Sequence, residues 1–292
     1  MAEIDILKYE TAYLQSYANS LELWPVEYTS YFVQTSYGKT HIIESGEKEL
    51  PPLILLHGAM MSSVMWYPNV LEWSKKYRVI AIDILGDKNK SIVEKELRTR
   101  EDYANWLREV FDKLSIEKAD IVGLSYGALN TVNFLMYAPE RVNKAVLLSP
   151  AETFVHFDPL FYSYVFGMIE NKDGIEKFFK WIFEDRYSIH PYLYKQNETA
   201  IKWTAASGSA ASTENKFLYV FSDEELASIQ TPLFLLLGEH EVMYDAKEAL
   251  NRAASLVENI TVGMVKGVGH LMSMENPEYI NQSILTFLTD EE

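Results

Sequence analysis

The chain has 292 residues, 48% of them hydrophobic, and its 26 basic and 42 acidic side chains give a formal net charge of −16. This is the composition of a globular protein with one large domain or two small ones. The acidic balance argues against nucleic acid or an anionic membrane surface as a partner, and the absence of cysteine excludes disulfides, thiolate metal sites and a cysteine nucleophile.

The first half of the chain is predicted to alternate strands and helices. A helix over residues 5–23 ends before Pro25, and a hairpin over residues 31–45 turns at Tyr37-Gly38. Continuous apolar runs then alternate with helical spacing, which is typical of parallel strands buried on both faces. The predicted strands are residues 53–57, 78–83, 119–124 and 144–149. The predicted helices between them are residues 65–76, 99–114 and 126–138.

The alternation stops over residues 151–225. This segment has helical spacing, holds 17 of the 39 aromatic residues and contains a small-residue stretch, Ala205 to Ser212, that is predicted to be a mobile loop. The last predicted elements are strands over residues 232–238 and 260–265 and helices over residues 245–256 and 277–288. The sequence therefore indicates one α/β sheet domain, residues 1–150 and 226–292, interrupted by a helical insertion.

Two segments bear on targeting. Residues 1–10 are acidic and lack the apolar stretch of a secretory signal. The uncharged run of nineteen residues from Ile121 to Pro139 contains glycine, serine and asparagine, which suit a buried strand and helix better than a lipid-facing helix. We therefore expect a soluble, cytoplasmic protein without a membrane partner.

The third apolar run leads directly into Gly123-Leu-Ser125-Tyr-Gly127, a G-x-S-x-G motif, and then into a helix. A tight strand-to-helix turn requires glycine on both sides of the nucleophile, because side chains there would collide with neighbouring backbone. The turn raises the Ser125 hydroxyl above the sheet, and the helix N-terminus behind it favours developing negative charge. In this context the motif indicates a nucleophilic serine.

The sequence resembles an α/β-hydrolase, and residues 123–127 resemble the nucleophile elbow of that superfamily. The resemblance extends from the hairpin to the last helix and is strongest near the elbow, His57, Gly238 and His270. Residues 1–30 are similar to the N-terminal stretch of small bacterial carboxylesterases. The resemblance implies a mostly parallel sheet flanked by helices, with residues 151–225 as a helical cap.

The oxyanion of a tetrahedral intermediate needs two hydrogen-bond donors. The backbone N–H after the nucleophile, on Tyr126, is expected to be one of them. His57-Gly58 follows a predicted strand and resembles the oxyanion loop of the family, which implies Ala59 N–H as the second donor and Met60 N–H as the alternative. The His57 imidazole itself is expected to cap the strand and brace the turn.

The general base of this fold follows the final strand, after the nucleophile and the acid in chain order. Of the six histidines only His270 does so, in Gly267-Val-Gly-His270, where glycines let the loop bend toward the serine. His41 lies in the hairpin, and His156 and His190 lie in the insertion, where an ordinary structural role is expected.

The acid of the family usually stands three residues after a glycine that ends the penultimate strand. By that resemblance Gly238-Glu-His-Glu241 implies Glu241, although glutamate replaces the usual aspartate and Asp245 stands where proline is common. A glutamate can orient the histidine, because the requirement is a carboxylate at the second ring nitrogen. Asp245, Glu239 and, after the preceding strand, Glu152 stay open as alternatives.

Other chemistries lack their motifs. An aspartate nucleophile, as in dehalogenases and epoxide hydrolases, is excluded because the elbow carries Ser125. Asp83-Ile-Leu-Gly86 resembles a D-x-x-G segment of the family, and Asp83 is expected to brace the loop near the oxyanion site. The sequence contains no H-E-x-x-H motif and no Gly-rich phosphate loop, so neither a metal nor a cofactor is predicted.

Together these residues predict a serine esterase of the carboxylesterase type, acting on a small to medium apolar ester whose pocket some of the insertion aromatics line. Another reaction of the same triad is the first alternative, since fold and triad do not fix the substrate: a thioesterase, C–C hydrolase, peptidase or perhydrolase. A non-catalytic ligand receptor is the second. The sequence contains no pattern that indicates an oligomeric state.

Overall fold

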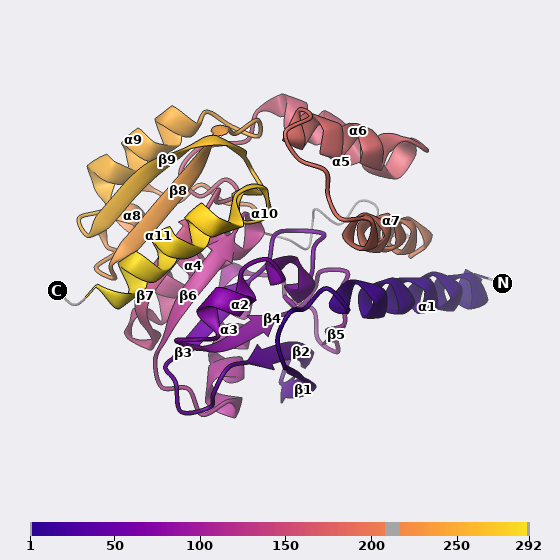
Figure 1. The fold of residues 1–292 in the computed structure, drawn as a ribbon, viewed down its shortest axis with the longest axis horizontal. Coiled ribbons are helices and arrows are strands. Elements are labelled where there is room, and N and C mark those ends of the chain that lie inside the picture. Colours follow the sequence, from indigo (N-terminus) through magenta and orange to yellow (C-terminus); the bar gives the residue numbers. More distant parts are fainter. Residues whose placement is uncertain (1, 208–216, 291–292) are drawn as a thin grey trace.

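The computed structural model describes residues 2–207 and 217–290, with the backbone alone for residues 2–5. The described strands are β1 (Thr29–Thr35), β2 (Gly38–Ser45), β3 (Pro52–Leu56), β4 (Arg78–Ile82), β5 (Ile92–Val93), β6 (Ala119–Leu124), β7 (Val142–Leu148), β8 (Leu233–His240) and β9 (Ile260–Gly269). They form one twisted sheet in the order β1-β2-β4-β3-β6-β7-β8-β9, with β5 paired to β2 (Figure 1). Strand β2 pairs antiparallel with β1 and with β4. The neighbours in the rest of the sheet, β4-β3-β6-β7-β8-β9, are all parallel.

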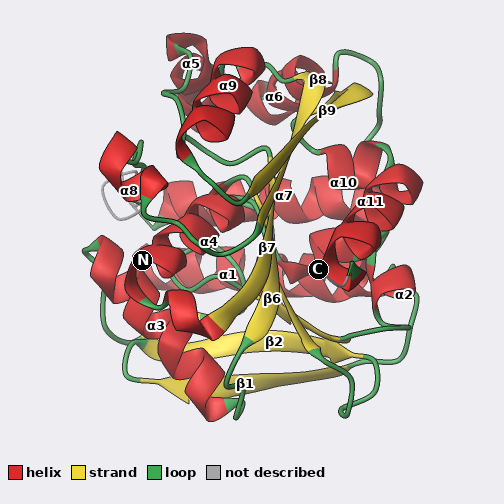
Figure 2. Ribbon diagram, turned by 90° about the vertical axis from the view of Figure 1, so that its left-hand side faces the viewer, coloured by secondary structure: helices red, strands yellow, loops and turns green. Residues whose placement is uncertain are grey.

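Helices cover both faces of this sheet. The described α-helices are α1 (Ala2–Leu21), α2 (Val70–Trp73), α3 (Arg100–Lys113), α4 (Tyr126–Tyr137), α5 (Pro159–Glu170), α6 (Gly174–Phe183), α7 (Pro191–Ala206), α8 (Asp223–Ala227), α9 (Ala246–Leu256), α10 (Met272–Glu275) and α11 (Pro277–Thr289). Figure 2 shows α3, α4 and α9 on one face and α2, α10 and α11 on the other. Because the central strands are shielded on both sides, their residues are apolar without alternation, and Leu53 to Leu56 are fully buried. The predicted α/β architecture is confirmed.

One predicted helix is wrong in part. In place of one helix over residues 65–76, the structure has a 3-10 helix, Ser63–Trp66, followed by the separate short helix α2. The two are separate because Pro68 between them cannot continue the helical hydrogen bonds. Trp66 and Trp73 are fully buried with ring centroids 5.7 Å apart, which explains the helical spacing of apolar residues in this stretch. The two-residue strand β5 and the single turn α10 are too short to give a sequence pattern.

The helices α5, α6 and α7 lie within the segment predicted as an insertion. In Figure 1, α7 lies alongside the N-terminal helix α1, and polar contacts join the two. Ser16 Oγ lies 2.7 Å from Thr199 Oγ1, and Gln196 Nε2 donates to Tyr13 Oη at 3.2 Å and to Ser62 Oγ, after β3, at 2.8 Å. Contacts with both α1 and the core therefore fix the position of α7.

The small-residue stretch predicted to be a mobile loop begins inside a helix. Ala205 and Ala206 are the last residues of α7, and residues 208–212 lie outside the described residues. The uncharged run from Ile121 to Pro139 is β6, the turn and α4, and nearly all of it is buried, as expected. Within residues 2–207 and 217–290, no helix combines the length and apolarity needed to cross a membrane.

Candidate active site

Ser125 stands at the turn between β6 and α4. Its backbone has φ 53° and ψ −113°, a left-handed conformation that costs a non-glycine residue about 1–3 kcal/mol. The flanking glycines make the turn possible: a Cβ on Gly123 would lie 2.5 Å from the Gly127 carbonyl oxygen, and a Cβ on Gly127 would lie 2.0 Å from the Leu56 carbonyl oxygen. Packing against the start of α4 therefore requires glycine at position 123, and packing against β3 requires glycine at position 127, as the motif predicts.

His270 and Glu241 meet although 28 residues separate them. His270 Nδ1 lies 2.8 Å from Glu241 Oε2, and both side chains are buried. The other oxygen of Glu241, Oε1, accepts the backbone N–H groups of Val242 and Met243, each at 3.0 Å, which fixes the carboxylate in place. A carboxylate at Nδ1 keeps the proton on that nitrogen, so that Nε2 carries the free lone pair.

The Nε2 atom of His270 is buried and makes no hydrogen bond within the described part of the chain. Ser125 and His270 line the same cavity. Ser125 follows β6, Glu241 follows β8 and His270 follows β9, and the carboxyl ends of parallel strands meet at one edge of a sheet. This edge therefore collects a hydroxyl, an imidazole and a carboxylate, the set that can activate a nucleophile.

The alternative acids bond elsewhere. Asp245 caps α9 by accepting the backbone N–H groups of Lys247 and Glu248 at 2.9 and 3.0 Å. Glu239 accepts Gly267 N–H at 2.9 Å. The carboxylate of Glu152 lies 3.1 Å from His156 Nδ1 instead of His270. Glu241 is thus the candidate acid that contacts the His270 imidazole.

The candidate oxyanion donors lie at the cavity wall, on the loop after β3 and at the start of α4. Ala59 and Met60 follow β3, and Tyr126 is the first residue of α4. Met60 N–H donates to Asp87 Oδ2 at 2.8 Å, so this donor is engaged by the protein itself. Ala59 N–H makes no hydrogen bond to the described residues, which favours Ala59 over Met60 as the second donor.

His57 and Asp83 brace the loops behind these donors. The buried His57 imidazole bonds the Gly58 carbonyl through Nδ1 at 2.8 Å and accepts Ile84 N–H at Nε2 at 2.9 Å, in agreement with the predicted bracing role. Asp83 is fully buried, accepts Ser63 N–H at 2.8 Å and lies 2.9 Å from His41 Nδ1. Burial alone would raise the pKa of Asp83, but the hydrogen bonds from His41 and from Ser63 N–H hold that pKa below its usual range.

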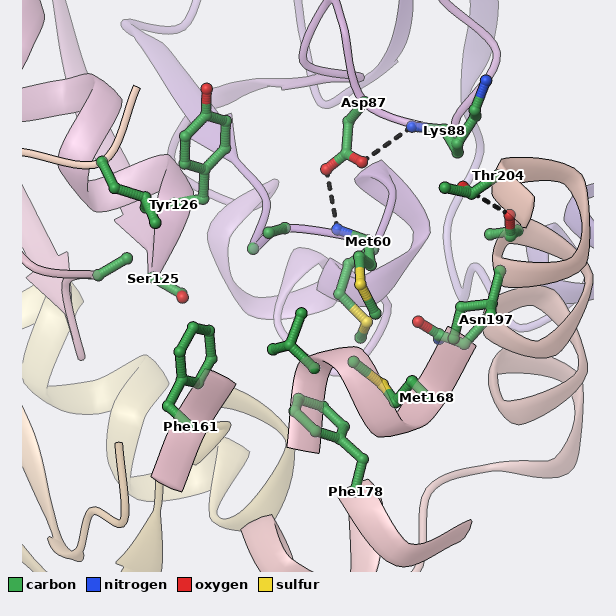
Figure 3. A pocket seen from close by; sticks show the side chains of 18 of the residues that line it. Met60, Asp87, Lys88, Ser125, Tyr126, Phe161, Met168, Phe178, Asn197 and Thr204 are labelled. Carbon is green, nitrogen blue, oxygen red and sulfur yellow. Dashed lines mark hydrogen bonds between the residues drawn. The ribbon is translucent and has the colours of Figure 1, made fainter. Parts of the chain in front are cut away.

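The cavity has a volume of about 400 Å³ and lies between the strand loops and the helices α5, α6 and α7. As predicted, some aromatic residues of the insertion line it, and Figure 3 shows Phe161 and Phe178 on the wall near Met168. The lining aromatics of the insertion are Phe157, Phe161, Tyr162, Phe178 and Phe179. Tyr164 instead packs helix α5 against Trp181 of α6, with ring centroids 4.4 Å apart, and Phe166 and Tyr192 are exposed. His156 and His190 do not line the cavity.

Three residues at the site carry no motif and were not predicted. Asp87 holds Met60 N–H, Asn197 of α7 lines the cavity, and Glu275 accepts the backbone N–H of Gly269, next to His270. The position of Asp87, directly after Gly86, gives a weak signal because it extends the D-x-x-G segment. In the described residues, no cluster of three or more His, Asp or Glu side chains has the arrangement of a metal site.

Comparisons with known proteins agree with this geometry. The sequence profile of the alpha/beta hydrolase fold matches residues 51–277. An uncharacterized carboxylesterase, nap, of Bacillus subtilis is 50% identical over 279 residues, which cover 96% of this chain and 93% of that protein. The crystal structure of carboxylesterase CesB (YbfK) from Bacillus subtilis matches with a TM-score of 0.93 and 48% identity, over 98% of this chain and 100% of that chain.

The crystal structure of naproxen esterase, also from Bacillus subtilis, matches with a TM-score of 0.92 and 49% identity, over 96% of this chain and 98% of that chain. The family profile covers more than three quarters of the sequence, and the relatives align over nearly their whole length. Fold, elbow and sequence similarity thus lead to the same conclusion: the chain belongs to the α/β-hydrolase family.

Proposed function

We propose that this chain is a carboxylesterase that cleaves its ester through an acyl-enzyme on Ser125. The observation that carries the proposal is the buried 2.8 Å contact between His270 Nδ1 and Glu241 Oε2, beside a cavity that Ser125 and His270 both line. The relatives at 48–50% identity are named carboxylesterases, which supports the same reaction here.

In the first half of the reaction Ser125 Oγ bonds to the ester carbonyl carbon while His270 Nε2 takes the hydroxyl proton. The electron pair of the carbonyl double bond moves to oxygen, and this oxyanion accepts hydrogen bonds from the N–H groups of Ala59 and Tyr126. When the intermediate collapses, the bond to the alcohol oxygen breaks, and His270 returns the proton to that oxygen. The products are the free alcohol and an acyl ester of Ser125.

In the second half water replaces the alcohol. His270 takes a proton from water, the hydroxide bonds to the acyl carbon, and Ser125 Oγ leaves and regains the proton as the carboxylic acid departs. Glu241 exchanges no proton in either half. Its carboxylate holds the His270 ring in one tautomer and stabilises the imidazolium that forms.

The walls of the cavity support an apolar substrate of small to medium size. Phe161, Met168 and Phe178 face it from α5 and α6, and a volume of about 400 Å³ limits the ligand. The cytoplasmic location and the absence of nucleic-acid or membrane partners stay predictions.

A pre-steady-state measurement with p-nitrophenyl butanoate tests the function. The wild type should release a burst of p-nitrophenol of about one equivalent per chain, followed by slower turnover. Ser125→Ala should reduce kcat by as much as about a million-fold, to background. Ser273→Ala is the matched control, because the Ser273 hydroxyl is buried, makes no hydrogen bond to the described residues and lies outside the cavity. Equal rates for the wild type and Ser125→Ala would refute the proposal.

A further inference from the structure

One wall of the cavity is polar, and Figure 3 shows Asn197 and Thr204 of α7 on it, with Asp87 and Lys88 nearby. Asn197 is only 4% exposed. Its Nδ2 donates to the Leu193 carbonyl at 2.9 Å, which fixes the orientation of the amide, because the flipped amide would set two oxygens against each other. The Asn197 Oδ1 therefore faces the cavity, and no described residue donates a hydrogen bond to it.

The neighbouring oxygens present acceptors as well. The Thr204 hydroxyl donates a hydrogen bond to the Ala200 carbonyl at 2.9 Å, so only its lone pairs face outward. The Asp87 carboxylate accepts Met60 N–H and has no proton to give when ionised. The Lys88 ammonium lies 4.6 Å from the centre of the Trp203 ring. The acceptors on this wall suit a ligand group that donates a hydrogen bond, such as a hydroxyl group.

The order of the strands indicates which half of an ester meets this wall. Asp87 follows β4 and Ala59 follows β3, on one side of β6 and Ser125, whereas Glu241 and His270 follow β8 and β9 on the other side. His270 protonates the leaving alcohol, so the alcohol half lies toward β9. The acyl half then extends the other way, toward α7 and Asn197.

We infer that Asn197 is a specificity-determining residue that binds a hydroxyl group on the acyl half, which makes hydroxyacyl esters a preferred substrate class. The inference rests on the proposed esterase function. Its physical basis is that an acyl chain bound in the cavity removes water from the Asn197 oxygen, and a ligand hydroxyl then supplies the donor that a methyl group cannot. The apolar walls of α5 and α6 accommodate the methylene chain.

The test compares esters that differ only by hydroxyl against methyl. The pairs are p-nitrophenyl 8-hydroxyoctanoate with p-nitrophenyl nonanoate, and p-nitrophenyl 6-hydroxyhexanoate with p-nitrophenyl heptanoate. We expect the wild type to have a higher kcat/KM for the hydroxyl ester than for the methyl ester in at least one pair. Asn197→Leu should lower this ratio of the two kcat/KM values by about fivefold to tenfold. Asn197→Ser keeps an acceptor, because its hydroxyl can donate to the Leu193 carbonyl while its lone pairs stay available, and it should retain part of the preference. Lys195→Gln, an exposed change on the same helix outside the cavity, should leave the ratio unchanged.

The outcomes separate the two proposals. The wild type could hydrolyse the methyl esters while Asn197→Leu shows the same ratio of hydroxyl-ester to methyl-ester kcat/KM as the wild type. This result would overturn the role of Asn197 and leave the esterase function intact. A wild type as slow as Ser125→Ala on every ester would overturn the function itself. A hydroxyl preference seen with 8-hydroxyoctyl against nonyl butanoate, but with neither acyl pair, would overturn the assignment to the acyl half.

Discussion

The Glu275 carboxylate accepts the backbone N–H of Gly269, whose nitrogen lies 3.0 and 3.1 Å from its two oxygens. Gly269 immediately precedes His270. The same carboxylate accepts from Arg186 Nε at 3.3 Å, and Arg186 Nη2 donates to the Ile182 carbonyl near the end of α6 at 2.9 Å. One ion pair therefore links the helix α6 to the loop that carries His270. Burial raises the pKa of Glu275, against the opposing effect of Gly269 N–H and Arg186.

We expect Glu275→Ala to lower kcat by about tenfold to a hundredfold with little change in KM, because a small displacement of His270 weakens proton transfer more than substrate binding. Glu275→Gln keeps an oxygen that accepts Gly269 N–H and should recover much of the rate. Steady-state kinetics on p-nitrophenyl butanoate gives both values. Glu184→Gln is the control, since Glu184 is an exposed second partner of Arg186. A Glu275→Ala variant with the wild-type kcat would show that the contact serves stability alone.

Glu241→Gln should lower kcat by about a thousandfold to ten-thousandfold, because an amide can donate to Nδ1 and thereby stabilise the wrong tautomer of His270. The comparison with Asp245→Asn and Glu239→Gln makes the test specific. Asp245→Asn weakens the cap of α9, and Glu239→Gln weakens the contact with Gly267, but neither side chain contacts His270. If either control loses as much activity as Glu241→Gln, then Glu241 is not the acid.

The strands and the serine turn could be predicted because each depends on local sequence. A run such as Leu53 to Leu56 is apolar without alternation. The glycines at positions 123 and 127 form a recognisable motif around the serine, although the contact that requires Gly127 comes from Leu56 of β3. Glu241 was implied by resemblance alone. Several carboxylates share its loop, and only the packing of β8 against β9 brings this one to His270.

The residues that sequence analysis did not identify act through contacts that form only in the folded chain. Asn197 lines the cavity because α1 and Ser62 hold α7 over the core, and Glu275 reaches Gly269 because α10 turns back beside β9. No spacing in the chain encodes either contact. The split of residues 65–76 was missed for a different reason: the buried Trp66 and Trp73 gave helical spacing across Pro68.

Asp87→Leu should lower kcat because it releases Met60 N–H and with it the loop that carries Ala59. Met60 has φ 62°, a left-handed conformation that the Asp87 contact helps to hold. We expect a loss of about tenfold to a thousandfold, up to the effect of removing one oxyanion donor. Asp87→Asn retains an acceptor oxygen and should lose less. Asp173→Leu, on the exposed surface beside Lys177, controls for the change in charge. Equal kcat in Asp87→Leu and wild type would contradict the role in positioning the loop.

Asp120, at the start of β6, should make the stability of the fold depend on pH. Its side chain is buried, and burial raises its pKa to about 6 although Lys144 N–H donates to Oδ1 at 3.2 Å. Because the folded pKa lies above the unfolded value, the stabilising contribution is complete below about pH 4 and is lost as the pH rises through about 6. Ionised Asp120 is thus unfavourable in the folded chain at neutral pH.

Asp120→Asn removes this titration while it keeps an oxygen for Lys144 N–H. We expect the variant to exceed the wild type in free energy of unfolding by up to about 3 kcal/mol at neutral pH, and the difference to shrink toward zero below about pH 4. Urea denaturation of both proteins across this range measures it, with Asp112→Asn as the control because Asp112 is exposed and pairs with Arg141. A stability difference that does not change between pH 4 and pH 7 would contradict a raised pKa at Asp120, because the linkage requires the advantage of asparagine to grow as the aspartate loses its proton.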